Sequence, residues 1–238
     1  MLMQYFFSFL LLVFTLFKSF TLQAQYAVVR DKDGYVNVRE DSAGDARIVD
    51  RISNQSLVCV WLNEVNDWSD VSYMKNGKEY SGYIHASRLV AVDSIPGVKL
   101  LKKTKHTGTT AVFQHDSIKV TIAVKPFVAK EHKFTYSDKA HTSIAKIDGK
   151  PYKGKDGEMP GTEFKSIEVQ WGKMRSVFPA SWIMNMCEIR ASAATIYVDE
   201  KKQRIYLEMS SFSDGAGWYT VMWLWEKGEV KSRLTWTP

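Results

Sequence analysis

Cysteine and histidine side chains are the first candidates for chemistry in this sequence, because a paired cysteine and histidine can act as nucleophile and base. The chain has two cysteines, Cys59 and Cys187, and five histidines, all of which lie upstream of Cys187. Cys187 follows the apolar residues Trp182, Ile183, Met184 and Met186 and has no polar or glycine-rich frame that would expose a thiolate. Cys59 lies within the apolar run 57–61. Both cysteines therefore fit small buried hydrophobic residues better than catalytic thiols.

The other polar clusters do not have the spacing that metal sites or paired carboxylates require. Four histidines match no zinc-ligand motif of a helix or short turn: His106, His115, His132 and His141. Asp156, Glu158 and Glu163 lie in or beside a glycine-rich loop, which does not fix the separation that catalytic carboxylates need. Residues 31–34 resemble the start of a calcium loop without its downstream acidic ligand, and the glycines of 214–217 fit a turn between strands. We predict no catalytic residue, no metal site, no cofactor and no enzymatic activity.

The segments that would position any functional side chain have the period-two alternation of β-strands. In the C-terminal part, Ile118, Val120, Ile122 and Val124 alternate with polar or small residues, and the same pattern recurs near 167–171 and 230–236. Residues 219–225 are apolar on both faces, which predicts a central strand. Pro179 is suited to begin one short helix. We expect residues 110–238 to form an antiparallel β-rich domain of unknown function.

The N-terminal part has shorter alternating runs that predict a small barrel over residues 25–92. Asn76-Gly77 is a strong signal for a hairpin turn. Residues 93–109 contain Pro96-Gly97 and four lysines, and they are predicted to be a linker between two separable domains. The alternative, that residues 98–101 pair as a strand within one continuous β-structure, stays open.

Three segments of the N-terminal part match a known family in order and spacing: residues 34–39 (GYVNVR), 68–71 (WSDV) and 82–85 (GYIH). Over residues 26–92 the sequence resembles the bacterial SH3 (SH3b) domain, with Asn54-Gln55 in place of the lysine-glycine turn often found there. The resemblance implies a small SH3-like barrel and a module that tethers secreted proteins to cell-wall peptides or other envelope ligands. The C-terminal part resembles only uncharacterised secreted bacterial proteins.

Three aromatic residues of this module are the candidate binding residues. The alternation places Tyr35, Trp68 and Tyr83 on the opposite face from the apolar residues of the barrel core. On that face they could line a shallow groove for a peptide or a glycan, since aromatic rings stack on both. The alternative is that these rings are only half-buried packing of a small barrel.

The first 24 residues differ from the rest of the chain. They contain an apolar run from residue 5 to 17 and a single charged side chain, Lys18. This run is too short for a membrane span and fits the core of a signal peptide, with Ala24 before the cleaved bond. We expect export to the periplasm or the exterior and a mature chain that begins at Gln25, with no stable membrane span; a retained anchor is the alternative.

The net charge of the chain indicates which kinds of partner it can attract. The chain carries a formal charge of +6, which becomes +5 without residues 1–24. This mild excess favours acidic envelope polymers and falls short of the dense basic stripe of a nucleic-acid-binding protein. The sequence predicts a non-catalytic exported envelope protein whose module binds a cell-wall or protein ligand, while the C-terminal domain offers a second interaction surface. A periplasmic inhibitor or immunity-type protein and a cell-wall hydrolase with an unrecognised site are the alternatives, and the oligomeric state is not predicted.

Overall fold

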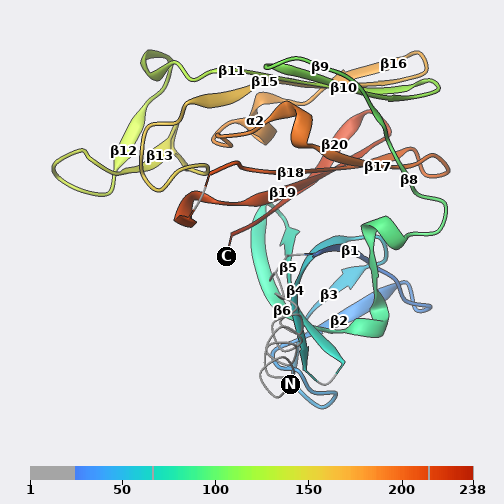
Figure 1. Ribbon diagram of the computed structural model, residues 1–238. Coiled ribbons are helices and arrows are strands. Elements are labelled where there is room, and N and C mark those ends of the chain that lie inside the picture. Colours follow the sequence, from blue (N-terminus) through green and yellow to red (C-terminus); the bar gives the residue numbers. More distant parts are fainter. Residues whose placement is uncertain (1–24, 66, 214, 238) are drawn as a thin grey trace, which may run out of the picture.

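The computed structural model describes residues 25–65, 67–213 and 215–237 of the chain. These residues form a mainly β protein whose sheets are antiparallel and stack in layers (Figure 1). The predicted fold class is thereby confirmed. The predicted signal peptide, residues 1–24, lies outside the described residues.

The N-terminal module, residues 25–95, is built on one curled seven-stranded sheet in the order β3-β2-β6-β5-β4-β1-β7. The strands are β1 (Gln25–Val29), β2 (Tyr35–Arg39), β3 (Ile48–Ser53), β4 (Leu57–Val65), β5 (Trp68–Lys75), β6 (Lys78–His85) and β7 (Leu89–Ala91), with the short turns η1 (Ala86–Arg88) and η2 (Val92–Ser94). The predicted hairpin is confirmed: Asn76 and Gly77 join β5 to β6, and both have positive φ, as a two-residue turn of this kind requires.

The alternating apolar side chains of the module meet in a core of its own. This core contains Ala27, Val29, Val36, Val38, Ile52, Val58, Val60, Val71, Tyr73 and Ile84. Gly82 lets β2 cross β6 closely, because an added Cβ would lie 2.6 Å from Val38 Cγ1 and 2.8 Å from the Arg39 carbonyl oxygen. Sequence alternation and one glycine thus account for the curl of this sheet.

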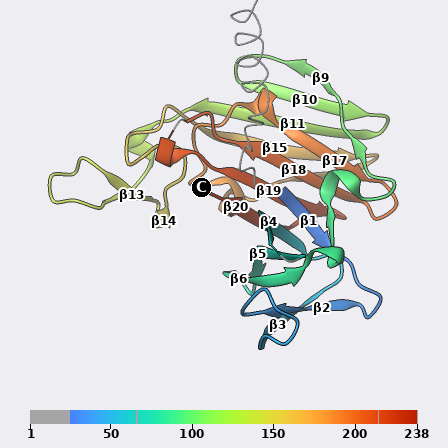
Figure 2. The same cartoon turned by 60° about the horizontal axis from the view of Figure 1, so that its bottom comes forward.

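The C-terminal part consists of two five-stranded sheets and a small three-stranded one. The outer sheet has the order β16-β15-β11-β10-β9, with β9 (Lys103–His106), β10 (Thr110–His115), β11 (Ile118–Pro126), β15 (Thr162–Trp171) and β16 (Met174–Val177). The inner sheet has the order β20-β19-β18-β17-β8, with β8 (Lys99–Leu100), β17 (Thr195–Asp199), β18 (Arg204–Ser210), β19 (Thr220–Glu226) and β20 (Glu229–Trp236). The small sheet contains β12 (Phe134–Tyr136), β13 (Ile144–Ile147) and β14 (Lys150–Pro151), and it extends from one side of the layers (Figure 2).

The two large sheets enclose the largest apolar core of the protein. It draws on alternate residues of both sheets and includes Phe113, Ile122, Phe164, Ile167, Ile205, Leu207, Val221, Trp223 and Trp225. The predicted helix is present as α2 (Ala180–Ile183), which begins directly after Pro179. The remaining short turns are η3 (Ala129–Glu131), η4 (Ala191–Ala193) and η5 (Gly215–Gly217).

The prediction of a linker over residues 93–109 is wrong for residues 99–106. Lys99–Leu100 forms β8, which pairs with β17, and Lys103–His106 forms β9, which pairs with β10. Between them Leu101 is buried, and its backbone N–H donates to the Ile196 carbonyl at 2.7 Å. These two strands lie at sheet edges, so their lysine side chains stay in solvent while the backbone is paired.

A further core, to which both parts of the protein contribute, joins the N-terminal module to the inner sheet. The module contributes Tyr26, Val28, Leu57, Cys59, Val92 and Ile95, and the sheet contributes Tyr206, Met222, Leu224, Leu234 and Trp236. Strands β1, β4 and β19 are therefore apolar on both faces, because each of them separates two cores. The central position predicted for 219–225 is confirmed, and its second apolar face is the one that the module covers (Figure 1).

Candidate functional site

Two of the three aromatic residues predicted for binding line one cavity of the N-terminal module. The cavity has a volume of about 300 Å³, and Tyr35 and Trp68 line it together with Arg39, His85 and Arg88. Tyr35 and Arg39 are at the two ends of β2, Trp68 begins β5, and His85 ends β6. The cavity therefore lies where the ends of three strands meet, beside the turn η1.

Cationic side chains lie against the rings of this cavity. The Arg39 guanidinium is 5.9 Å from the centre of the Trp68 ring, and that of Arg51 is 5.0 Å from the centre of the Tyr35 ring. The His85 ring meets Trp68 edge to face at 5.4 Å. Such contacts hold the aromatic rings in place while Tyr35 stays 38% exposed, so a ligand can still reach it.

The rim of the cavity is polar. Arg88 Nε lies 3.0 Å from Asp31 Oδ2, and the other carboxylate oxygen of Asp31 accepts the Asp33 N–H at 2.8 Å. His85 Nδ1 lies 2.9 Å from the Ser87 hydroxyl. The arrangement offers aromatic faces, guanidinium groups and hydroxyls, which suit the amides of a peptide or the hydroxyls of a glycan.

The third predicted residue, Tyr83, does not line this cavity. It is half-buried on β6, where it pairs with Asp70 of β5 and with Arg39 of β2. Sequence reasoning also missed the contribution of Arg39 and His85. The sequence contained only a partial signal: Arg39 is four residues after Tyr35 on one strand and so shares its face, but the pairing of His85 with Trp68 is seen only in the structure.

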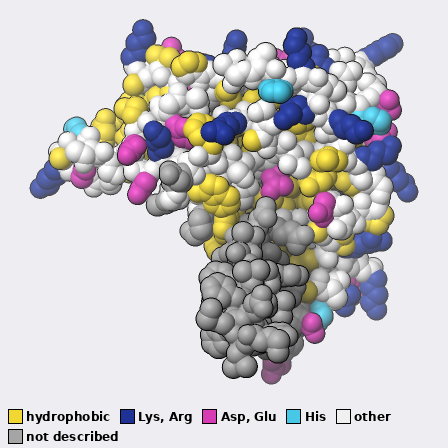
Figure 3. Space-filling view, in the orientation of Figure 1, with side chains coloured by type: hydrophobic (Ala, Val, Ile, Leu, Met, Phe, Trp, Pro, Cys, Tyr) yellow, Lys and Arg dark blue, Asp and Glu magenta, His cyan; other side chains and the backbone are white. Residues whose placement is uncertain are grey.

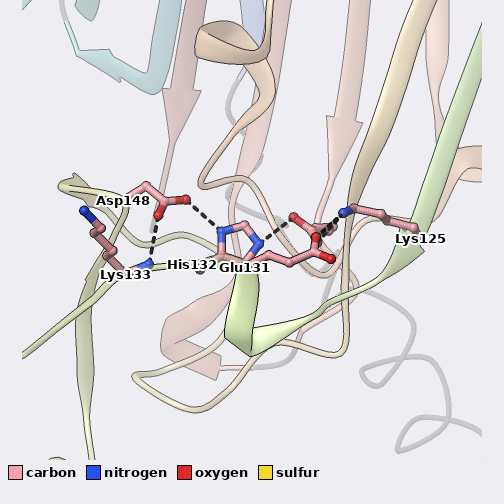
Figure 4. Close-up of polar contacts among 6 residues, drawn as sticks. Lys125, Glu131, His132, Lys133 and Asp148 are labelled. Atoms are coloured by element: carbon pink, nitrogen blue, oxygen red, sulfur yellow. Dashed lines mark hydrogen bonds and ion pairs between the residues drawn. The ribbon is translucent and has the colours of Figure 1, made fainter.

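A charged cluster on the C-terminal part has the residue types of a catalytic site (Figure 4). His132 Nδ1 is hydrogen-bonded to Asp148 Oδ2 at 2.7 Å, and its Nε2 lies 3.1 Å from Glu163 Oε2. The Nε2 contact has the distance but not the direction of a hydrogen bond, so it is an ion pair. Lys125 Nζ bridges Glu131 at 3.1 Å and Glu163 at 3.2 Å. His132 also stacks on Phe127, with ring centres 4.5 Å apart.

Attraction between the charged side chains of this cluster holds separate segments of the chain together. We call the cluster the clamp; it contains Lys125, Glu131, His132, Asp148 and Glu163. Burial disfavours the charged form of His132, but the hydrogen bond to Asp148 and the nearby carboxylate of Glu163 outweigh it and raise the pKa of the imidazole. The hydrogen bond from His132 lowers the pKa of Asp148. Each ring nitrogen of His132 lies against a carboxylate, and this arrangement holds the side chain in place. The cluster instead ties η3 and the β13–β14 turn to the start of β15.

The clamp should stabilise the protein in a pH-dependent way. Because the folded-state pKa of His132 is raised, its contribution is complete below the ordinary histidine value of about 6.5 and is lost as pH rises through the folded-state pKa. We expect His132→Gln to lower the free energy of unfolding by about 1–3 kcal/mol at pH 5.5, and by less at each higher pH. Urea unfolding between pH 5.5 and 9 measures this difference. His106→Gln, on the exposed edge strand β9, is the matched control and should change little at any pH; a pH-independent loss in His132→Gln would contradict the clamp.

The two cysteines lie in apolar surroundings. Cys59 is fully buried in the core between module and inner sheet, and burial raises the pKa of its thiol to about 12. Cys187 is buried beside Ile144 and Ile147, and burial raises the pKa of its thiol still further. A thiol with such a pKa is not ionised near neutral pH and is a poor nucleophile.

Two further absences apply to the described part of the chain. No group of three or more His, Cys, Asp or Glu side chains within residues 25–65, 67–213 and 215–237 is placed to hold a metal ion. Within the same ranges, no helix has the length and apolar character needed to cross a membrane.

Comparison with protein-family models, with curated proteins and with solved structures finds no match to this chain.

Proposed function

We propose that the protein is a non-catalytic exported binding protein whose N-terminal module holds an envelope ligand in the Tyr35–Trp68 cavity. The observation that carries the proposal is the convergence of two aromatic side chains, from separate strands, on one cavity with a polar rim. The ligand class that fits is a cell-wall peptide or glycan, or a peptide segment of an envelope protein, because such ligands combine stacking surfaces with amides or hydroxyls.

The resemblance to the SH3b family supports the same site. Each of its three matching segments contributes to the cavity: residues 34–39 supply Tyr35 and Arg39, residues 68–71 supply Trp68, and residues 82–85 supply His85. These segments belong to β2, β5 and β6, which are neighbours in the sheet, so the residues of the family pattern and the cavity lie in one place. The proposed role as a tethering module therefore rests on a place in the fold as well as on a sequence pattern.

Location and charge are part of the proposal. The apolar run before Lys18 supports export, so the site would face the periplasm or the exterior. On the face shown in Figure 3 the lysine and arginine side chains are spread over the C-terminal sheets among neutral and acidic ones. A spread of this kind favours a solvated surface over a nucleic-acid site. In this proposal the C-terminal part serves as a second interaction surface.

Sedimentation with envelope material tests the proposal. Purified protein beginning at Gln25 should pellet with isolated cell walls or envelopes from a bacterium and should leave their turbidity unchanged. A fall in turbidity would instead support a wall hydrolase. Protein that stays in the supernatant but forms a one-to-one complex with a soluble periplasmic protein would support an inhibitor.

A further inference from the structure

A large cleft lies between the N-terminal module and the C-terminal part, separate from the Tyr35–Trp68 cavity. Its volume is about 1100 Å³. The β5–β6 hairpin of the module forms one wall, and β14, α2 and the end of β20 contribute to the other. Ligand sites occur preferentially at such junctions between domains, and this cleft is at the upper end of their usual size.

Aromatic side chains line the cleft from both walls. Trp61 of the module meets Trp236 of β20 edge to face, with ring centres 5.4 Å apart. Trp182 of α2 and Tyr80 of β6 also line it, and Tyr80 is 43% exposed. These rings offer apolar and stacking surface to a bound molecule.

The C-terminal wall carries a cation without an anionic partner. Arg233 Nη1 donates to the Trp182 carbonyl at 2.9 Å, and no carboxylate among the described side chains forms an ion pair with Arg233. Lys150 donates to the neighbouring Ser181 carbonyl at 3.0 Å, and burial together with the Arg233 charge lowers its pKa. Burial likewise lowers the pKa of Arg233. A partly buried cation in this state gains from a bound anion.

Two hydrogen-bonding atoms in the cleft are also unused. Trp236 is only 3% exposed and its Nε1–H has no partner, and the buried Oδ1 of Asn185 accepts no hydrogen bond. Both residues line the cleft. Buried polar atoms nearly always have partners, so both atoms would gain from the amide of a ligand if their side chains turned toward the cleft.

The opposite wall of the cleft carries a carboxylate without a cationic partner among the described side chains. Asp70 of β5 lines the cleft, and it forms no ion pair or hydrogen bond with any side chain that the structure describes. Burial raises the pKa of Asp70. The cleft therefore presents the unpaired Arg233 on one wall, which Lys153 also lines, and the unpaired Asp70 on the other, which Glu79 also lines, with aromatic rings on both walls.

We infer that this cleft binds a short peptide with free termini, whose carboxylate pairs with Arg233 and whose ammonium group pairs with Asp70. An acidic saccharide would satisfy Arg233 but would leave Asp70 unmatched. A peptide supplies both charges, each of which can form a charge-assisted hydrogen bond. This site is independent of the proposed envelope ligand and of the Tyr35–Trp68 cavity.

Calorimetric titration with trialanine tests the inference first on the unaltered protein, so that no variant has to fold. Trialanine with free termini should bind, and the C-terminal amide should bind about tenfold or more weakly, because one charge-assisted contact is lost. N-acetyltrialanine should also bind more weakly. Equal affinity for all three forms, or no binding of any form, would overturn the inference.

Variants then place the two termini. Arg233→Gln, which can still donate to the Trp182 carbonyl, should weaken trialanine but remove the penalty for the amide, and Asp70→Asn should remove the penalty for N-acetylation. Arg175→Gln on the exposed strand β16 is the control and should bind as the unaltered protein does. Preserved binding in the Tyr35→Ala/Trp68→Ala protein separates this site from the proposed function. Arg233-dependent binding of trigalacturonate with no binding of trialanine would assign the cleft to an acidic saccharide and contradict the inference.

Discussion

A chain shortened to residues 96–238 is expected to aggregate, because it exposes the apolar face of the inner sheet that the module covers. That face contains Tyr206, Met222, Leu224, Leu234 and Trp236. Large contiguous apolar patches are rare on soluble monomers and promote association. Size-exclusion chromatography of the expressed fragment should show aggregates or no soluble protein, whereas the chain from residue 25 elutes as a folded species.

A polar replacement distinguishes this cause from a general failure to fold. In the same fragment, Met222→Thr with Leu224→Thr keeps strand propensity and removes much of the apolar patch. This version should regain soluble material. If the unaltered fragment is itself a soluble monomer with cooperative unfolding, the two parts do not depend on their shared core.

Trp223→Ala should produce the largest loss of stability of any single change considered for this protein. Trp223 is fully buried between the two large sheets, where it meets Phe164 and Phe178 edge to face at 5.8 and 6.4 Å. Its Nε1–H donates to the Trp182 carbonyl at 2.9 Å. Removal leaves a cavity and breaks this hydrogen bond, so we expect a loss of about 3–5 kcal/mol in the free energy of unfolding.

Denaturant unfolding followed by circular dichroism measures this loss. A change of that size is a large part of the roughly 5–15 kcal/mol that stabilises a typical domain. Trp68→Ala is the matched control, since Trp68 is half-buried at the rim of the module and should cost far less. Equal losses in the two variants would mean that the core between the sheets does not dominate stability.

Local patterns were sufficient to predict several elements of this fold. Alternation predicted the strand over 118–124, Asn76-Gly77 predicted the β5–β6 hairpin, and Pro179 predicted the start of α2. Each of these signals acts within a few residues of chain. For that reason each signal predicts its element correctly in any tertiary arrangement of the chain.

Long-range packing could not be predicted in the same way. The lysines of 99–105 indicated a linker, yet an edge strand can pair its backbone and leave such side chains in solvent. The second apolar face of β19 and the apolar run of β4 were visible in the sequence, but a pattern does not name the surface that covers it. For this reason the shared core between the module and the inner sheet could not be predicted.

The candidate site was predicted in part, for the same reason. Alternation placed Tyr35 and Trp68 on the outer face, but only the strand pairing shows that their cavity includes Arg39 and His85 and not Tyr83. The His132 clamp unites Lys125, Asp148 and Glu163 from separate segments, and no spacing in the sequence indicates such a contact.

The central claim, that the Tyr35–Trp68 cavity holds the envelope ligand, is tested most directly by sedimentation of the Tyr35→Ala/Trp68→Ala protein with isolated cell envelopes. Stacking on each aromatic ring contributes about 0.5–1.5 kcal/mol beyond area burial, so the double variant should bind roughly one to two orders of magnitude more weakly. Tyr83→Ala, on the same module but outside the cavity, should bind nearly as the unaltered protein does. A double variant that keeps its circular dichroism spectrum and its full envelope affinity would contradict the claim.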